Sequence, residues 1–222
     1  MLYDAHTHLM SQAVLDQCFS EGLSTVICCA TRPQQWEKLS QIHAEKKAVL
    51  PAFGIHPWYV ENVQESDYEI LDSLLTTIPE SLLGEIGLDK NKENYDKQLQ
   101  VFERQLFLTK NTPKAVQIHS VGAWNDIMPM LRKFPDNRYF FHRFNGSLQI
   151  MNQLNSFCSA YFGTIVPERL TDIPADKLLL ESDSPDGLSF PWNVKDFVKK
   201  NALDTVTLSD NLRGYLNGNK TG

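Results

Sequence analysis

LYDAHTH, residues 2–8, joins a short apolar run to two histidines, His6 and His8, near the start of the chain. Alternate residues of a β-strand point to the same face, so the two imidazoles project together. In a parallel barrel, side chains at the C-terminal ends of the strands face the barrel mouth. The stretch therefore predicts a first barrel strand whose two histidines can share one metal ion.

Seven further apolar runs follow, and segments with the apolar spacing of helices separate them. This alternation is typical of βα units around a parallel sheet. The expected strands are residues 2–5, 25–29, 49–55, 82–86, 115–118, 139–141, 160–163 and 178–180. Eight such units favour an α/β fold, a (β/α)8 TIM-type barrel in a single domain, over the alternative of a doubly wound open sheet.

The chain has 222 residues, whereas about 250 is typical of this barrel. We therefore expect a compact barrel with room for distortion. Residues 156–174 leave space for only a short seventh helix, and two more helical stretches, near 194–200 and 208–216, follow the eighth strand. We expect the barrel to span residues 1–216 and a polar C-terminal tail to span residues 217–222.

Composition limits the classes of function. The formal net charge is −6, so the chain lacks the basic body that holds duplex DNA through many phosphate contacts, and nucleic-acid affinity must come from a local site. No charged leader with an apolar core precedes the first motif, and no apolar run approaches the roughly 18 residues of a membrane span. We therefore expect a cytoplasmic protein with no membrane partner.

The four cysteines lie at positions 18, 28, 29 and 158 and form no CxxC pair. The adjacent pair at 28 and 29 sits inside an apolar stretch, residues 26–30. We expect buried, reduced thiols.

Residues able to bind a metal close six of the eight runs. Besides His6 and His8, they are His56, Glu85, His119, His142 and Asp183. A lone histidine at a strand end is more often a hydrogen-bonding residue than a ligand, but these positions converge on one barrel mouth. The sixth histidine, His43, lies in the helical segment 36–47 and is interpreted as an ordinary surface residue.

Four histidines with Glu85 and Asp183 make a nitrogen and oxygen ligand set for two divalent ions, and Glu85 is placed to bridge them. Gly84 and Gly87 would let the backbone and the metals approach closely. Two such ions bring four positive charges against two carboxylates, so the pocket attracts an anion. Because paired metals can bind phosphate oxygens and activate a water, the pattern leads to the hypothesis of a phosphodiester hydrolase.

A set of motifs, taken together, resembles the TatD family of metal-dependent deoxyribonucleases. They are DAHTHL (4–9), GIHP (54–57), GEIGLD (84–89), IH (118–119), FHRFNGS (141–147) and LLLESDSP (178–185). The resemblance implies a (β/α)8 barrel with two divalent ions, zinc, manganese or magnesium. It also implies a nuclease that trims single-stranded DNA from the 3′ end, so single-stranded DNA or another phosphodiester is the expected partner.

The same resemblance implies a role for each site residue. His6, His8 and Asp183 hold one metal ion, Glu85 bridges, and His119 and His142 hold the second. Asp183 also orients or deprotonates the attacking water, so Asp183 and Glu85 are the expected catalytic residues. His56 touches the substrate phosphate.

The chain departs from the family pattern in three places. Val121 stands two residues after His119, where the family usually has an arginine. Arg143 follows His142 where small residues are common, so we expect it either to supply a guanidinium to the phosphate or to be a surface residue. After Asp183, PDGLSFPW at 185–192 replaces the usual Arg-Asn-Glu-Pro stretch and the C-terminal helical region is shorter, which leaves substrate choice open.

Trp58 follows His56-Pro57 in a loop, and we interpret it as a platform on which an unpaired base stacks, with packing as the alternative. Two other functions remain open. The first is a hydrolase of a small amide, lactone or phosphoester, and the second is a non-catalytic binding subunit. Glu85 stands where many related amidohydrolases carry a carboxylated lysine, which favours the nuclease, and the complete ligand set argues against a binding subunit.

Overall fold

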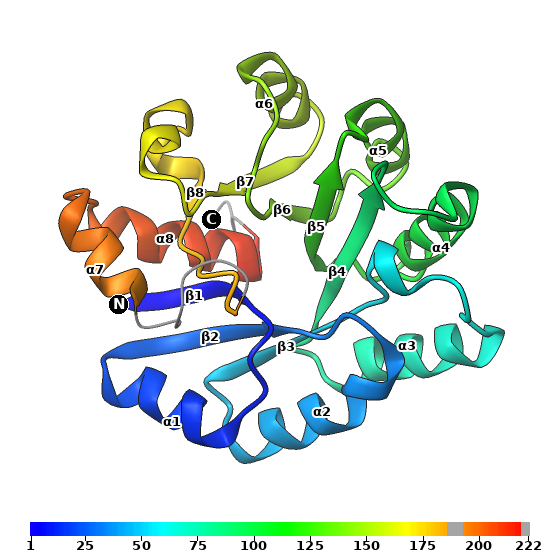
Figure 1. Cartoon of the computed structure of the whole chain (residues 1–222), viewed down its shortest axis with the longest axis horizontal. Helices are drawn as coiled ribbons and strands as arrows, with labels where there is room; N and C mark the ends of the chain where they lie inside the picture. Colours follow the sequence, from blue (N-terminus) through cyan, green and yellow to red (C-terminus); the bar gives the residue numbers. More distant parts are fainter. Residues whose placement is uncertain (186–192, 219–222) are drawn as a thin grey trace.

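Eight parallel strands form one sheet in which each strand pairs with the next along the chain, and the sheet curls into a nearly closed barrel (Figure 1). The structure is a computed structural model that describes residues 1–185 and 193–218. The strands are β1 (Leu2–Thr7), β2 (Leu23–Cys29), β3 (Val49–Phe53), β4 (Leu82–Asp89), β5 (Ala115–Val121), β6 (Arg138–Phe141), β7 (Ser159–Gly163) and β8 (Leu178–Leu179). The predicted (β/α)8 barrel is confirmed, and the doubly wound alternative is wrong.

Helices surround the barrel as an outer ring, except for the last helix, which lies across one end of the barrel (Figure 1). They are α1 (Gln12–Ser20), α2 (Trp36–Glu45), α3 (Glu65–Thr77), α4 (Tyr95–Phe107), α5 (Trp124–Leu131), α6 (Leu148–Asn155), α7 (Asn193–Lys200) and α8 (Thr205–Asn217). Between β7 and β8 the described chain has only two 3-10 helices, η3 (Pro167–Asp172) and η4 (Ala175–Lys177). The lack of room for a full seventh helix is therefore confirmed.

The barrel closes between β1 and the segment that follows β8. The amide of Ala5 donates to the Leu180 carbonyl at 2.8 Å, and the amide of Asp183 donates to the His6 carbonyl at 2.9 Å. The buried Asp4 carboxylate accepts from the backbone amide of Ser182 at 2.9 Å and from its hydroxyl at 2.5 Å. These bonds bring the two ends of the sheet together even though β8 itself is only two residues long.

Helix α8 lies across the base of the barrel, where it contacts β1, β5, β6, β7 and β8. Its carbonyls at Tyr215 and Leu216 accept from the Arg138 guanidinium at 2.6 and 3.0 Å, and the ammonium of Met1 donates to Ser209 Oγ at 2.9 Å. The two predicted helical stretches after the eighth strand are confirmed. The first residue of the expected tail, Asn217, ends α8, and residues 219–222 lie outside the described residues.

Burial corrects one prediction about the helical layer. His43 is buried, not an ordinary surface residue, because its ring reaches the Val49 carbonyl at 2.7 Å. Cys18, Cys28 and Cys29 are buried free thiols as expected, whereas Cys158 is partly exposed. Within the described residues, no helix combines the length and apolar character needed to span a membrane.

Gly87 allows β4 and β5 to approach each other below the mouth. It has a φ of +150°, and a Cβ there would lie 1.9 Å from the carbonyl oxygen of His119. We expect Gly87→Ala to destabilise the fold by about 3 kcal/mol or more, because both backbone strain and overlap oppose the side chain. Urea unfolding measures this loss.

Gly22 is the matched control for that prediction, because its φ is +102° but nothing lies within 4 Å of the position that a Cβ would occupy. Gly22→Ala therefore adds strain without overlap and is expected to cost about 1–2 kcal/mol. Equal losses in the two variants would show that contact with β5 is unimportant.

Candidate metal centre

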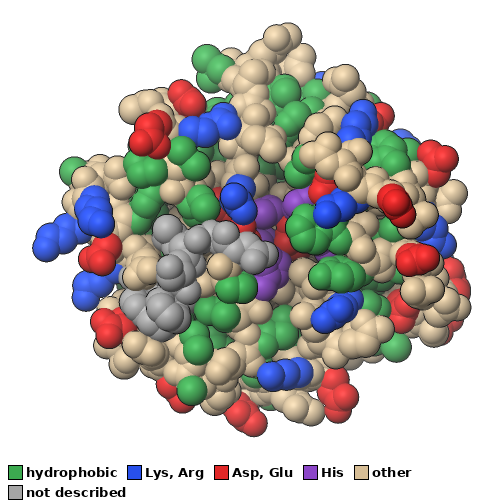
Figure 2. Space-filling model, viewed as in Figure 1, with side chains coloured by type: hydrophobic (Ala, Val, Ile, Leu, Met, Phe, Trp, Pro, Cys, Tyr) green, Lys and Arg blue, Asp and Glu red, His purple; other side chains and the backbone are tan. Residues whose placement is uncertain are grey.

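The site lies at the C-terminal ends of the strands, where histidine side chains occupy the bottom of a hollow with lysine and arginine side chains near its rim (Figure 2). The hollow opens into a cavity of about 980 Å³. It is lined by six of the predicted site histidines and carboxylates, namely His8, His56, Glu85, His119, His142 and Asp183. His6 lies beneath them and is fully buried.

Glu85, on β4, is the centre of the cluster. Its Oε1 lies 2.6 Å from His142 Nε2, 2.9 Å from His119 Nδ1 and 3.4 Å from His56 Nε2. Burial on its own raises the pKa of Glu85, but His142 and the other facing histidines outweigh burial and hold that pKa well below its usual range. Glu85 is therefore an anion in the middle of a ring of nitrogens.

The second oxygen of Glu85 faces strand β1 and Asp183. Oε2 lies 3.3 Å from His8 Nε2 and 3.5 Å from His6 Nε2, and Asp183 Oδ1 lies 3.6 and 3.7 Å from the same two nitrogens. Burial opposes charge on Asp183, but the hydrogen bond from His8 and the nearby histidines lower its pKa overall. Burial opposes charge on His8 in the same way, and Asp183 and Glu85 raise its pKa well above the usual range. The buried carboxylates of Glu85 and Asp183 thus favour a positive charge in the space between them, beside His6 and His8.

The Nδ1 atoms of His6 and His8, which point away from the cluster, each face a hydrogen-bond acceptor. Gln117, on β5, donates its amide nitrogen to the Ala5 carbonyl at 2.8 Å, which leaves its oxygen to accept from His6 Nδ1 at 2.9 Å. His8 Nδ1 donates to the carbonyl of Cys29 at 3.0 Å. Both rings therefore turn Nε2 toward the cluster, the nitrogen through which each ring would bind a metal ion once any proton on it is lost.

The donor set fits divalent cations. Three groups each place one donor atom per residue within 4.8 Å of the others: His6, His8 and Asp183; His6, Glu85 and His142; and His56, Glu85 and His119. Ligand atoms bound to one ion at about 2.1 Å are separated by roughly 3 Å, similar to the spacings here. Burial lowers the pKa of His142 to about 4, so that ring is neutral at physiological pH and carries a lone pair.

His56 differs from the other histidines of the site. Its Nδ1 accepts the backbone amide of Trp58 at 3.2 Å, so the proton of the neutral ring is on Nε2. Burial lowers the pKa of His56, which keeps the ring neutral. The Nε2 that faces Glu85 is therefore a hydrogen-bond donor and lacks the lone pair that a metal ligand requires.

Arg143 lies beside the cluster because the backbone turns at this residue, just after the end of β6. Its φ is +41°, and its amide donates to Glu181 Oε1 at 2.8 Å. The half-exposed guanidinium donates from Nη1 to Asp183 Oδ2 at 3.0 Å. The structure thus places this arginine at the cavity wall beside Asp183 and not on the outer surface.

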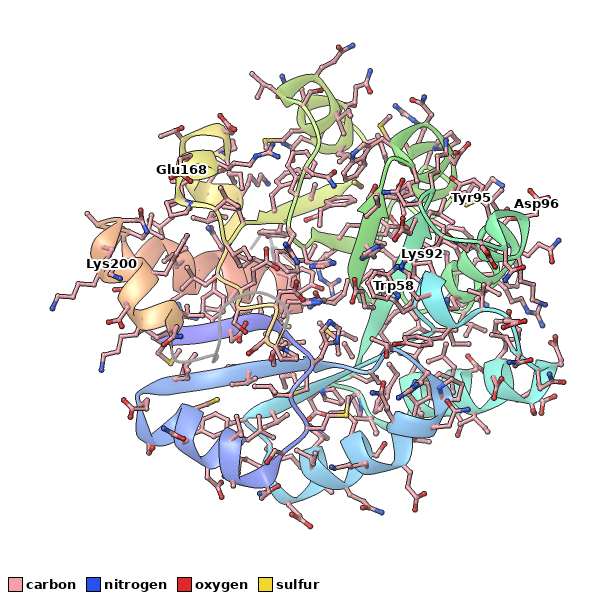
Figure 3. All side chains as sticks on the ribbon, in the orientation of Figure 1. Trp58, Lys92, Tyr95, Asp96, Glu168 and Lys200 are labelled. Atoms are coloured by element: carbon pink, nitrogen blue, oxygen red, sulfur yellow. The ribbon has the colours of Figure 1, made fainter. Side chains whose placement is uncertain are left out.

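Trp58 lies at the rim, on the 3-10 helix η2 (Pro57–Tyr59), with 48 % of its surface exposed. Its indole nitrogen donates to the buried Asp89 at 2.7 Å, and the Lys92 ammonium lies 4.4 Å from its ring centroid (Figure 3). The indole is therefore anchored at its edge, and about half of the residue's surface is exposed at the rim. By contrast, Trp124 and Phe144 pack against each other, and Trp192 lies outside the described residues.

Three residues that contact the cluster from behind were not predicted from the sequence: Gln117, Asp89 and Glu181. Gln117 carried a readable signal, because it stands two residues before His119 within β5 and so shares a strand face with it. Glu181 stands two residues before Asp183, but both residues lie beyond the end of β8. Asp89 Oδ2 lies 3.7 Å from His119 Nε2 at the very end of β4.

Comparison of the sequence with known proteins identifies relatives that are named as nucleases. The family model "TatD related DNase" matches residues 3–213. The human protein named 3'-5' RNA nuclease TATDN2 is 30 % identical over 166 residues, which cover 68 % of this chain and 21 % of that protein. The Shigella flexneri protein named 3'-5' ssDNA/RNA exonuclease TatD is 23 % identical over 186 residues, covering 78 % of this chain and 72 % of the relative.

A solved structure shows the same architecture. The crystal structure of YjjV, a TatD homologue from Escherichia coli, superposes with a TM-score of 0.84 over 97 % of this chain and 98 % of that one, at 22 % sequence identity. At that identity the match is evidence of a shared fold only. The family match, which extends over nearly the whole chain, shows that this protein belongs to the TatD-related DNase family of metal-dependent hydrolases.

Proposed function

We propose that this protein is a phosphodiester hydrolase that uses two divalent metal ions, zinc, manganese or magnesium, to trim single-stranded DNA from its 3′ end. The observation that carries the proposal is the set of buried histidines and carboxylates around Glu85 at the bottom of an open cavity. Neutral imidazoles with carboxylates are donors for all three ions, with magnesium retaining more water.

In this proposal His6, His8 and Asp183 would hold one ion, His119 and His142 would hold the other, and Glu85 would be shared between the two. The short separations of Glu85 from all four histidines support the bridging role. When bound, the ions would neutralise phosphate charge and lower the pKa of an attacking water.

The remaining steps belong to side chains of the protein. Asp183, whose pKa is lowered, stays a carboxylate that would orient the attacking water or deprotonate it. His56 donates a hydrogen bond from its Nε2–H to a phosphate oxygen, in line with the tautomer that the Trp58 amide imposes. The Arg143 guanidinium, now paired with Asp183, donates to a second phosphate oxygen across the cavity.

A flexible single strand suits this site better than a duplex. The net charge of −6 provides no broad basic surface, so affinity is concentrated at the cavity and its rim. The exposed indole of Trp58 offers a face on which an unpaired base can stack. The nuclease names of the human and Shigella relatives support a nucleic-acid substrate.

Metal removal and replacement tests the proposal. The protein is stripped with chelator, restored separately with magnesium, manganese or zinc, and followed for cleavage of single-stranded DNA labelled at the 5′ end. Stepwise shortening from the 3′ end that requires metal would support the proposal. Metal uptake without cleavage of any oligonucleotide would direct attention to a small-molecule hydrolase, and absence of uptake would overturn the metal centre.

Trp58→Ala is expected to raise KM for single-stranded oligonucleotides roughly five- to hundredfold with little change in kcat, because one stacked base contributes about 1–3 kcal/mol. Steady-state kinetics on a short oligonucleotide measures the change. Trp58→Phe keeps a ring and loses only the bond to Asp89, so it should retain most of the affinity. An unaltered KM in the alanine variant would rule out stacking at this residue.

Arg143→Ala is expected to raise KM by about tenfold, since a charged hydrogen bond contributes about 1.5–3 kcal/mol and this guanidinium is half exposed. Arg143→Lys keeps the charge but loses the planar fork and should recover part of the affinity. Steady-state cleavage of a short single-stranded oligonucleotide measures KM for the two variants and the parent. Affinity and cleavage equal to those of the parent would contradict the phosphate contact.

A further inference from the structure

Two buried polar atoms without hydrogen-bond partners face each other behind the cluster. His142 Nδ1 and Glu181 Oε2 lie 3.8 Å apart, and neither has a hydrogen-bond partner within the part of the chain that the structure describes. An unsatisfied buried polar group costs about 1–3 kcal/mol, so two that face each other require an explanation.

The Glu181 carboxyl is fixed in its position. Its Oε1 accepts the amide of Arg143 at 2.8 Å, at the left-handed turn where the chain leaves β6. On the other side, a Cβ at Gly163 of β7 would lie 2.3 Å from Oε1, so only glycine leaves room for the carboxyl there. The Glu181 side chain is fully buried. Oε2 therefore stays directed toward His142.

His142 needs such an acceptor. Its Nε2 faces Glu85 at 2.6 Å, and its ring stacks on His6 with centroids 4.1 Å apart and planes 5° apart. Stacking fixes the plane of the ring, but a ring flipped by 180° would stack equally well. Stacking alone therefore does not decide which atom of the ring faces Glu85.

The β1 histidines show how this choice is made elsewhere in the cluster. His6 Nδ1 donates to Gln117 and His8 Nδ1 donates to a carbonyl, and each leaves Nε2 free to bind a metal. His142, like His6 and His8, turns its Nε2 into the cluster. The group that faces its Nδ1, in the place of Gln117 or the backbone carbonyl, is the Glu181 carboxylate.

We propose that Glu181 is a positioning residue that accepts the Nδ1 proton of His142 and so holds its Nε2 lone pair toward the metal centre. The inference rests on the proposed metal site. Carboxylates behind metal-binding histidines fix the tautomer and the orientation of the ring, and their loss typically weakens metal affinity 10- to 100-fold, as an order of magnitude.

Glu181→Gln is the sharpest variant, because it preserves shape and removes the acceptor. The Gln oxygen still accepts the Arg143 amide, so the NH2 group faces His142 Nδ1 and favours a proton on Nε2. Manganese titration of the stripped protein, followed by calorimetry and by the electron paramagnetic resonance of free manganese, should show one ion weakened on the order of 10- to 100-fold and the other little changed. The manganese affinity of Glu181→Asp should fall between that of the parent and that of Glu181→Gln.

Glu168→Gln is the matched control, since Glu168 is exposed on η3 away from the cluster (Figure 3). Its manganese affinity should equal that of the parent. Equal affinity of the parent and a folded Glu181→Gln variant would overturn the inference while leaving the metal centre intact. Failure of the parent to bind manganese, zinc or magnesium would instead overturn the proposed function.

A second measurement does not depend on any variant. In zinc-loaded parent protein, nitrogen-correlated proton NMR should show the His142 proton on Nδ1, in slow exchange and at the low field of a bond to a carboxylate. A comparison with His142→Asn assigns the resonance. A proton on Nε2, or an Nδ1 proton that exchanges with solvent as a free imidazole does, would overturn the role of Glu181.

Discussion

Asp183→Asn should reduce kcat on single-stranded DNA on the order of 10³-fold or more, because the amide neither accepts the proton of the attacking water nor carries its charge. The variant should still fold. Asp183 has a φ of +47°, a conformation that asparagine adopts as readily as aspartate, and the two side chains have the same shape. The loss is therefore expected in the chemical step, with KM little affected.

Single-turnover cleavage of end-labelled single-stranded DNA at saturating manganese measures this loss, and circular dichroism verifies the fold. Asp210→Asn is the matched control, because Asp210 is an exposed aspartate of α8 at the opposite end of the barrel, paired with Arg213. The control should cleave at the parent rate. Parent-like kcat in Asp183→Asn would remove this residue from the proton transfer.

Glu85→Gln should abolish activity and also prevent the binding of both metal ions. The carboxylate contacts nitrogens of both halves of the cluster, and a glutamine would place an NH2 group among imidazoles that need an acceptor or a cation. An ion present at a hundred times its dissociation constant stabilises the fold by about 2.7 kcal/mol. The variant should lose the increase in Tm that metal gives the parent.

Metal content by mass spectrometry and thermal unfolding with and without manganese test this second expectation. Glu80→Gln provides the control, because Glu80 is exposed and precedes β4 at its other end. It should bind two ions and show the full increase in Tm. Two ions retained by Glu85→Gln would mean that Glu85 does not bridge them.

The fold could be predicted from the sequence because each barrel strand is a short apolar run that ends in a residue with evident chemistry. The run at 2–5, for example, extends in the structure to Thr7, so His6 lies within β1 and His8 directly after it. Strand β8 was recognisable mainly because LLL precedes the acidic residues, since only two of its residues pair regularly. Parallel order then followed from the need for a helix between successive strands.

Contacts across the barrel could not be predicted in the same way. Gln117 reaches His6 across 111 positions of sequence, and Glu181 lies behind His142, a residue of another strand. A single sequence carries no spacing that reports such neighbours. The burial of His43 was missed for a related reason, because a polar ring in a helix resembles a surface residue until the Val49 carbonyl that it contacts is known.

The helix across the barrel base has a consequence for synthesis on the ribosome. Ser209 of α8 contacts Met1, 208 positions away, and Arg138 of β6 contacts the last turn of the same helix. A nascent chain cannot seal the apolar base of its barrel until α8 has left the exit tunnel, because α8 is the helix that contacts β1, β5, β6, β7 and β8 there. Long-range closure of this kind slows folding, so the apolar base of the emerging barrel stays exposed to aggregation until the helix docks.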